Sequence, residues 1–242
     1  MLDDADPVNA RVTAVNTIGS SATSASGNGA ALPVATAPGA PTGLTRNAAT
    51  SKTQASLTWT APSDDGTSSI VDYLVEHDQG SGSWTTGSAN VVGTGYTQEG
   101  LSTGVSYKFR VSARNAVGHG TPSDEFTIIT AVIPSQPGTP ATALNGSNID
   151  ITWAAPSDLG GVTLDYYTIE IQKADLSWST ETTHCDGSDS TIISNAACSI
   201  PLATLSTTHS LTTGDSVTVR VTAVNAIGPS QISSEGDGAT VP

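Results

Sequence analysis

The chain has 242 residues, a length that suits about two domains. Acidic residues outnumber basic residues 22 to 8, and the resulting net charge of −14 argues against nucleic acid and anionic membrane surfaces as partners. No apolar run reaches about 18 residues, so we expect no membrane-spanning helix. The many Ser, Thr, Gly and Pro residues favour an all-β protein with many turns.

One motif occurs three times along the chain. Residues 11–19, 110–118 and 220–228 each read as an alternating strand, Arg-Val-(Thr/Ser)-Ala-x-Asn, followed by a turn that ends in Gly. A unit repeated at a spacing of about a hundred residues indicates an array of similar domains. The first copy comes too early for a whole domain, so we expect it to be the end of an incomplete one.

The second unit shows the apolar alternation of half-buried strands. Ala55, Leu57 and Trp59 alternate with polar residues, and the same period of two occurs from Tyr107 to Ala113. Further strands are predicted near residues 70–75, at Trp84 and at residues 126–130. Residues 62–66 between the first two strands have the composition of a loop.

The third unit follows the same order with one enlargement. Trp153 and Trp178 match Trp59 and Trp84 at an offset of 94, whereas the later strand from Val217 to Ala223 matches at an offset of 110. Sixteen residues are therefore inserted between these elements. Both cysteines of the chain fall in this enlarged segment.

A disulfide between Cys185 and Cys198 would hold the enlarged segment in place. In the chain-entropy model such a loop closure is worth about 3 kcal/mol. Disulfides persist in oxidising compartments, so the pair favours an extracellular or cell-surface location. Two reduced, buried thiols are the alternative. A metal site is not expected because only His184 lies nearby and the spacing is not that of a zinc site.

The second and third units resemble the fibronectin type III domain. The resemblance lies in a Trp followed by Pro on one strand, a Tyr on the next, a Leu six residues before the later strand, and an Ala-x-Asn-x-x-Gly turn; these are Trp59, Pro62, Tyr73, Leu101 and residues 113–118, with Trp153, Pro156, Tyr167, Leu211 and residues 223–228 as counterparts. It implies tandem, immunoglobulin-like, seven-stranded Greek-key β-sandwiches. In that fold Tyr107 would be the tyrosine-corner residue, but Val217 and Val8 occupy its place in the other two units.

The resemblance divides the chain into three segments. Residues 1–34 are expected to be the last two strands of an incomplete domain, residues 35–133 a complete domain, and residues 134–242 a complete domain with the enlarged, disulfide-clipped loop. From residue 11 to 33, 14 of 23 positions are identical to residues 220–242, so the first segment is related to the third. An alternating array of two domain types, with about 209 residues per pair, would explain this.

An isolated two-stranded hairpin is marginally stable, so another element is expected to cover its apolar side, formed by Val8, Val12 and Ala14. Three interpretations stay open: an earlier part of a longer repetitive chain, a neighbouring subunit that adds strands, or docking onto the chain's own second domain. A simple head-to-tail swap is disfavoured because the third segment already has all its strands.

The sequence offers little chemistry. No catalytic residues, cofactor or metal site are predicted, because the four histidines have no nucleophile at a recognisable spacing. Asp64, Asp65 and Asp158 lie in equivalent loops and are weak calcium candidates, since Asp also suits turns. Trp84 and Trp178 are candidate platforms for sugar rings, although packing on their own sheet is the more ordinary role. Asn145, in Asn145-Gly-Ser147, is a candidate N-glycosylation site.

We therefore expect a non-enzymatic extracellular structural protein whose repeats build a surface fibre, filament or coat. Its partners would be other copies or further repeats of the same protein, and glycans are a secondary candidate. The alternative is an adhesion, glycan-binding or protein-binding module of a receptor or secreted enzyme. An enzyme is the least expected class, because no loop gathers the groups that catalysis requires.

Overall fold

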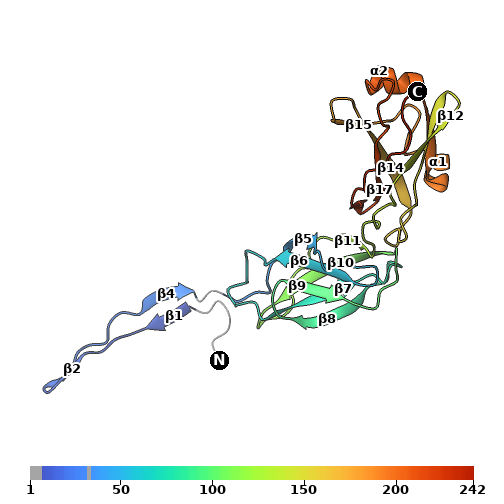
Figure 1. The fold of residues 1–242 in the computed structure, drawn as a ribbon. Helices are drawn as coiled ribbons and strands as arrows, with labels where there is room; N and C mark the ends of the chain where they lie inside the picture. The colour runs from blue at the N-terminus through green and yellow to red at the C-terminus, as the bar shows by residue number, and fades with distance from the viewer. Residues whose placement is uncertain (1–6, 32–33) are drawn as a thin grey trace. The chain divides into compact units, whose positions relative to one another are not determined.

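The structure, a computed structural model, describes the backbone of residues 7–31 and 34–242 (Figure 1). By internal contacts the chain separates into two compact units, one holding the segments up to residue 47, 56–96 and 107–128, and the other holding 48–55, 97–106 and 129–242. Among the described residues, no helix is long and apolar enough to cross a membrane. The predicted boundaries at residues 34 and 133 stay predictions.

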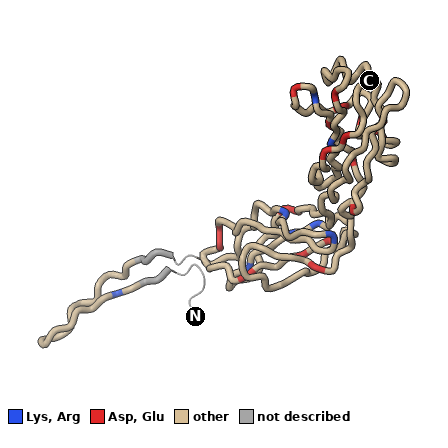
Figure 2. The backbone as a smooth tube through the Cα atoms, in the orientation of Figure 1, with Lys and Arg blue, Asp and Glu red and all other residues tan. Residues whose placement is uncertain are grey.

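The first described segment is a long two-stranded hairpin. Its outer pair is β1 (Pro7–Ala10) with β4 (Gly27–Ala31), and its inner pair is β2 (Val15–Asn16) with β3 (Gly19–Ser20). Arg11 is its only charged residue, in contrast to the acidic residues spread over the rest of the chain (Figure 2). The hairpin therefore differs in composition from both sandwiches.

The middle of the chain forms a β-sandwich of seven strands. One sheet has the order β5-β6-β9 and the other has the order β11-β10-β7-β8. The strands are β5 (Thr42–Arg46), β6 (Ala55–Thr60), β7 (Asp72–His77), β8 (Thr85–Val91), β9 (Gly95–Gln98), β10 (Ser106–Arg114) and β11 (Phe126–Ile129). We call this the N-terminal sandwich.

Alternation of side chains builds its core as the sequence predicts. Leu57 and Trp59 on β6 are buried, as are Phe109 and Val111 on β10. The Trp59 and Tyr73 rings meet edge to face with centroids 5.3 Å apart. Because each strand presents every second side chain to the facing sheet, the two sheets share one apolar interior.

The last part of the chain forms a second seven-stranded sandwich, with sheets β12-β13-β16 and β15-β14-β17-β18. Its strands are β12 (Ala141–Asn145), β13 (Asn148–Thr152), β14 (Leu164–Gln172), β15 (Trp178–Thr180), β16 (Ala197–Pro201), β17 (Val219–Asn225) and β18 (Gly228–Pro229). The Trp153 and Tyr167 ring centroids lie 5.1 Å apart, again edge to face. This C-terminal sandwich confirms the all-β tandem fold class.

The enlargement of the C-terminal sandwich consists of two parts. The backbone amide of Trp59 bonds to the Thr94 carbonyl, and that of Trp153 bonds to the Ala196 carbonyl, an offset of 102 at this point. The inserted residues therefore divide evenly on either side of β16. The first part contains α1 (Ser190–Asn195), and the second forms α2 (Leu202–Thr208). The repeat spacing predicts the enlargement but not these helices.

Candidate functional site

The hairpin repeats the backbone geometry of the last two strands of the C-terminal sandwich. The pairs Val15–Ser20 and Asn16–Gly19 correspond to Val224–Pro229 and Asn225–Gly228 at an offset of 209. The outer pairs, Pro7–Ala31 and Ala10–Gly27, correspond at the same offset to the bridges Ser216–Thr240 and Val219–Gly236. Both segments are thus the same structural element in the same register.

Two serines reinforce this register identically in both places. The Ala14 amide donates to Ser21 Oγ at 3.1 Å and the Val12 amide to Ser24 Oγ at 3.0 Å. The equivalent amides, of Ala223 and Val221, donate to Ser230 Oγ at 3.1 Å and to Ser233 Oγ at 2.9 Å. In the N-terminal sandwich the Val111 amide donates to Ser123 Oγ, but Gly120 stands in the place of the other serine. The hairpin therefore matches the C-terminal sandwich.

The hairpin turn is held by an asparagine. Asn16 Oδ1 accepts the amides of Ile18 and Gly19 at 2.9 and 3.1 Å, as Asn225 Oδ1 accepts those of Ile227 and Gly228. An Asn side chain that bonds to the backbone two and three residues later forms such turns without tertiary support. The turn is therefore held by contacts within the hairpin itself.

What differs between the two segments is burial. Val12 is 69% exposed and Ala14 is exposed, whereas their equivalents Val221 and Ala223 are fully buried. Val8 lies in β1, but its side chain falls outside the described residues. The strand-pairing role of Val8, Val12 and Ala14 stays a prediction, now with a defined geometry: an ordered strand pair whose sandwich-facing side is uncovered in the described chain.

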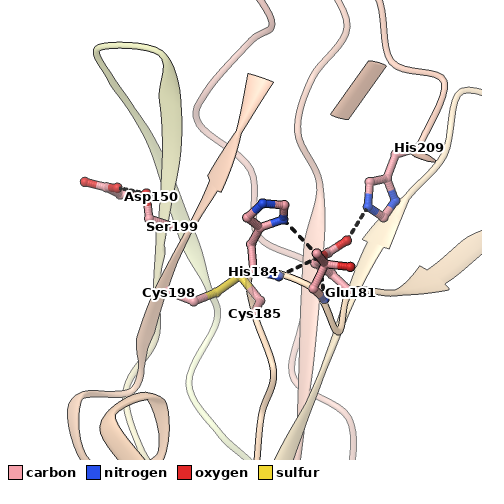
Figure 3. The surroundings of a disulfide bond; sticks show 8 residues. Asp150, Glu181, His184, Cys185, Cys198, Ser199 and His209 are labelled. Atoms are coloured by element: carbon pink, nitrogen blue, oxygen red, sulfur yellow. Dashed lines mark hydrogen bonds and ion pairs between the residues drawn. A yellow bond between two sulfur atoms is a disulfide. The ribbon is translucent and has the colours of Figure 1, made fainter. Parts of the chain in front are cut away.

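Cys185 and Cys198 are joined by a disulfide in the structure, with Cα atoms 5.4 Å apart (Figure 3). Cys185 is fully buried in the loop after β15, and Cys198 lies on β16 opposite Ile151 of β13. Because β15 and β16 belong to different sheets, the bond ties the first inserted loop to the facing sheet.

A buried carboxylate lies beside this disulfide. Glu181 is 2% exposed, and its Oε1 accepts the amides of Thr183 and His184, each at 2.9 Å. Its Oε2 lies 3.1 Å from Nε2 of the fully buried His209 (Figure 3). Burial acts to raise the pKa of Glu181, but these hydrogen bonds outweigh it and leave the pKa below its ordinary value. The group fixes the inserted segment to the segment after α2.

Trp84 and Trp178 have equivalent surroundings. The Arg110 guanidinium lies 4.2 Å from the Trp84 ring centroid and bonds to both carboxylate oxygens of Glu76. Arg220 stacks on Trp178 at 4.1 Å and bonds to Glu170 in the same way. An arginine of the same sandwich thus stacks on each indole ring. This arrangement accounts for both Trp residues structurally.

The loop aspartates have structural roles as well. Asp64 Oδ1 accepts the Gly66 amide, Asp65 Oδ1 the Thr67 amide, and Asp158 Oδ1 the Gly160 amide, each at 2.9 Å. Over the described part of the chain, no group of three or more His, Cys, Asp or Glu residues is arranged to hold a metal ion. These carboxylates stabilise their own turns.

Asn145 lies at the tight turn between β12 and β13, where it pairs with Asn148. Its side chain is exposed and donates to Asp150 Oδ2 at 2.8 Å. Hydrogen bonds from Ser199 and Asn145 lower the pKa of Asp150. The side-chain nitrogen that would carry the glycan is thus at the surface. The predicted glycosylation stays a prediction.

The Glu181–His209 pair was not predicted from the sequence. The two residues are 28 positions apart in a segment without a template in the other units, and neither belongs to a repeated motif. The only available signal was a lone acidic residue directly after a predicted strand, which ordinarily indicates a solvated turn.

Comparison with known proteins gives the family of part of the chain. Residues 39–129 match the model of the fibronectin type III domain. Fibronectin type-III domain-containing protein 3a of Gallus gallus is 31% identical over 124 residues, which are 49% of this chain and 10% of that protein. Exoglucanase B of Cellulomonas fimi is 33% identical over 141 residues, which are 55% of this chain and 12% of that protein.

The Neuronal cell adhesion molecule of Rattus norvegicus is 38% identical over 105 residues, which are 40% of this chain and 8% of that protein. The chain thus spans between 8% and 12% of the length of these three relatives. The activities of whole relatives are not transferred by matches of this extent. The C-terminal sandwich repeats the strand order of the N-terminal sandwich and its paired Trp and Tyr rings. The fold agrees with the family match, and residues 39–129 belong to the fibronectin type III family.

Proposed function

We propose that this chain is part of a non-enzymatic extracellular structural protein, in which tandem β-sandwiches build a surface fibre, filament or coat. In this proposal the hairpin of residues 7–31 joins units by pairing with the strands of another sandwich. One observation carries the proposal: Val12 has the backbone environment of the fully buried Val221, yet it is 69% exposed. An ordered strand pair with an uncovered apolar side is suited to strand addition.

Other features support a structural role. Several carboxylates and cations pair across strands of one sandwich, as Glu76 and Arg110 do. The disulfide Cys185–Cys198 suits an oxidising, extracellular environment. The Ser- and Thr-rich surface also suits glycosylation.

Assembly is the direct test. The purified chain should form polymers that electron microscopy and sedimentation detect, and Val12→Glu should abolish them because a carboxylate would enter the joined core. Thr17→Glu is the matched control, since its equivalent, Ala226, is exposed in the C-terminal sandwich. A wild-type chain that stays monomeric at all accessible concentrations would contradict the proposal.

A binding module is the second candidate. Tyr166, 41% exposed, lies at a shallow groove also lined by Thr180, Asp186 and Ser188. An exposed aromatic ring beside hydroxyl and carboxylate groups suits a sugar ring. Saturable binding to a glycan array that Tyr166→Ala removes would favour this function over the structural one.

A further inference from the structure

The C-terminal sandwich shows which contacts the hairpin lacks. Asn225 Nδ2 donates to the backbone carbonyls of Val132 and Leu159 at 2.8 and 2.9 Å. Asn16 forms the same turn, but its Nδ2 has no acceptor among the described residues. A side-chain amide oriented by its own turn and left with two free donors indicates that two carbonyl groups belong opposite it.

Arg11 gives the second indication. Its equivalent, Arg220, bonds to both oxygens of Glu170, at 2.8 and 3.1 Å, and stacks on Trp178. Arg11 is exposed and has neither an ion pair nor a ring contact in the described part of the chain. The single charge of the hairpin therefore lies where a Glu and a Trp of a partner would meet it.

Gly27 gives the third indication. A Cβ atom on its equivalent, Gly236, would lie 1.7 Å from the Pro140 carbonyl oxygen, so only glycine fits at that position. A Cβ atom on Gly27 would meet only the Ala10 carbonyl oxygen, at 4.0 Å. No described residue therefore requires glycine at position 27, whereas a backbone segment packed there as Pro140 packs on Gly236 would require it.

We propose that the partner of the hairpin is residues 132–211 of a second copy of this chain, which receive the hairpin in place of their own residues 216–240. This inference rests on the proposed function and names its partner. Arg11 would then meet Glu170 and Trp178, and Asn16 would meet the carbonyls of Val132 and Leu159. Because the third segment already has all its strands, the hairpin can bind there only by displacing residues 216–240. The two strand pairs therefore compete for one place, and joining is an exchange between copies.

Disulfide trapping between full-length chains tests the register. The donor chain carries Arg11→Cys. The acceptor chain carries Glu170→Cys, with Val221→Glu to expel its own strand pair and Val12→Glu to disable its own hairpin. Because Arg220 is directly opposite Glu170, cysteines introduced at positions 11 and 170 should join after the chains are refolded together. Mass spectrometry of the cross-linked peptides identifies the bond.

The donor chain provides the controls. Adding Val12→Glu or Gly27→Ala to it should lower the yield of the 11–170 bond by about tenfold or more, since a buried charge or a clash opposes docking. Adding Thr17→Glu should leave the yield unchanged. Equal yields from all donors would show random collision of thiols and overturn the inference.

A peptide of residues 212–242 with Arg220→Cys tests whether the acceptor is competent. If the peptide cross-links to the Glu170→Cys acceptor and the donor chain does not, the hairpin has another partner and the inference fails. If neither cross-links, residues 132–211 accept no strand pair and the inference fails as well. Polymers that form without the 11–170 bond would support the proposed function and overturn this choice of partner. The 11–170 bond without polymers would support the partner and overturn the proposed function.

Discussion

Glu181 and His209 form a pair that is almost completely removed from solvent, with Oε2 and Nε2 3.1 Å apart. Glu181 also binds two backbone amides of the loop that leads to Cys185. This carboxylate therefore joins the loop after β15 to the segment after α2.

Removing the carboxylate should destabilise the C-terminal sandwich strongly. Glu181→Ala leaves two amides and a buried imidazole without their acceptor, so we expect a loss of about 3 kcal/mol in the free energy of unfolding. Urea denaturation followed by Trp fluorescence measures this. The exposed Glu235→Ala is the control, with an expected change within about 0.5 kcal/mol. Equal effects of both changes would contradict a specific role.

Stability should depend on pH through the same group. Because the pKa of Glu181 is lower in the folded chain than in the unfolded chain, its contribution is complete above the unfolded pKa and is lost as the pH falls through the folded value. The wild-type free energy of unfolding should therefore fall more steeply than that of Glu181→Gln below about pH 4.5. Parallel acid profiles for the two proteins would refute this.

Breaking the disulfide should affect one sandwich only. The Cys185→Ala and Cys198→Ala double variant should lose about 3 kcal/mol from the C-terminal sandwich, because the unfolded chain gains loop entropy. Calorimetry should show one transition lowered and the transition of the N-terminal sandwich unchanged. A shift of both transitions, or of neither, would count against this assignment.

A single methyl group should disturb the disulfide loop. A Cβ atom at position 187 would lie 1.7 Å from the Tyr167 carbonyl oxygen, so Gly187→Ala must displace the loop from β14. We expect a cost of about 1 to 3 kcal/mol, as for overpacked cores. Gly27→Ala is the matched control in the described hairpin and should leave the unfolding of the isolated chain unchanged.

Asn145 should carry a glycan when the chain passes through a eukaryotic secretory pathway. The side chain is exposed at a tight turn, where an added sugar meets solvent. Intact mass before and after glycosidase treatment measures occupancy, with Ser147→Ala as the control that removes the acceptor signal. An unchanged mass in the wild-type protein would show that the turn is not used.

Repetition made most of the fold predictable. The alternation around Trp59 and Phe109 predicts strands because a half-buried strand requires a period of two, and a second copy with the same spacing supports the alignment. The same logic placed Val12 and Ala14 on one face of the hairpin. The strand and the buried face of a residue can be predicted from the sequence where the residue belongs to a repeated, periodic pattern.

The structure of residues without a counterpart in another unit could not be predicted in this way. Helix α1 has six residues and only Ile192 buried, which is too short for a helical period to appear. Its start is fixed by the Asp189 side chain, which accepts the Thr191 amide, a signal shared by ordinary turns. The role proposed for Asn16 Nδ2 depends on two carbonyl groups that its own segment does not contain, so only comparison with Asn225 indicates it.

The self-supporting turn of the hairpin also has a kinetic consequence. Hydrogen bonds to Asn16, Ser21 and Ser24 already hold the turn end of the hairpin, so joining would require less ordering of the chain there. A rigid connector of this kind keeps more of its contact energy as affinity than a floppy tail does. Subunits linked through it would dissociate slowly on dilution, and the material that they form would resist washing.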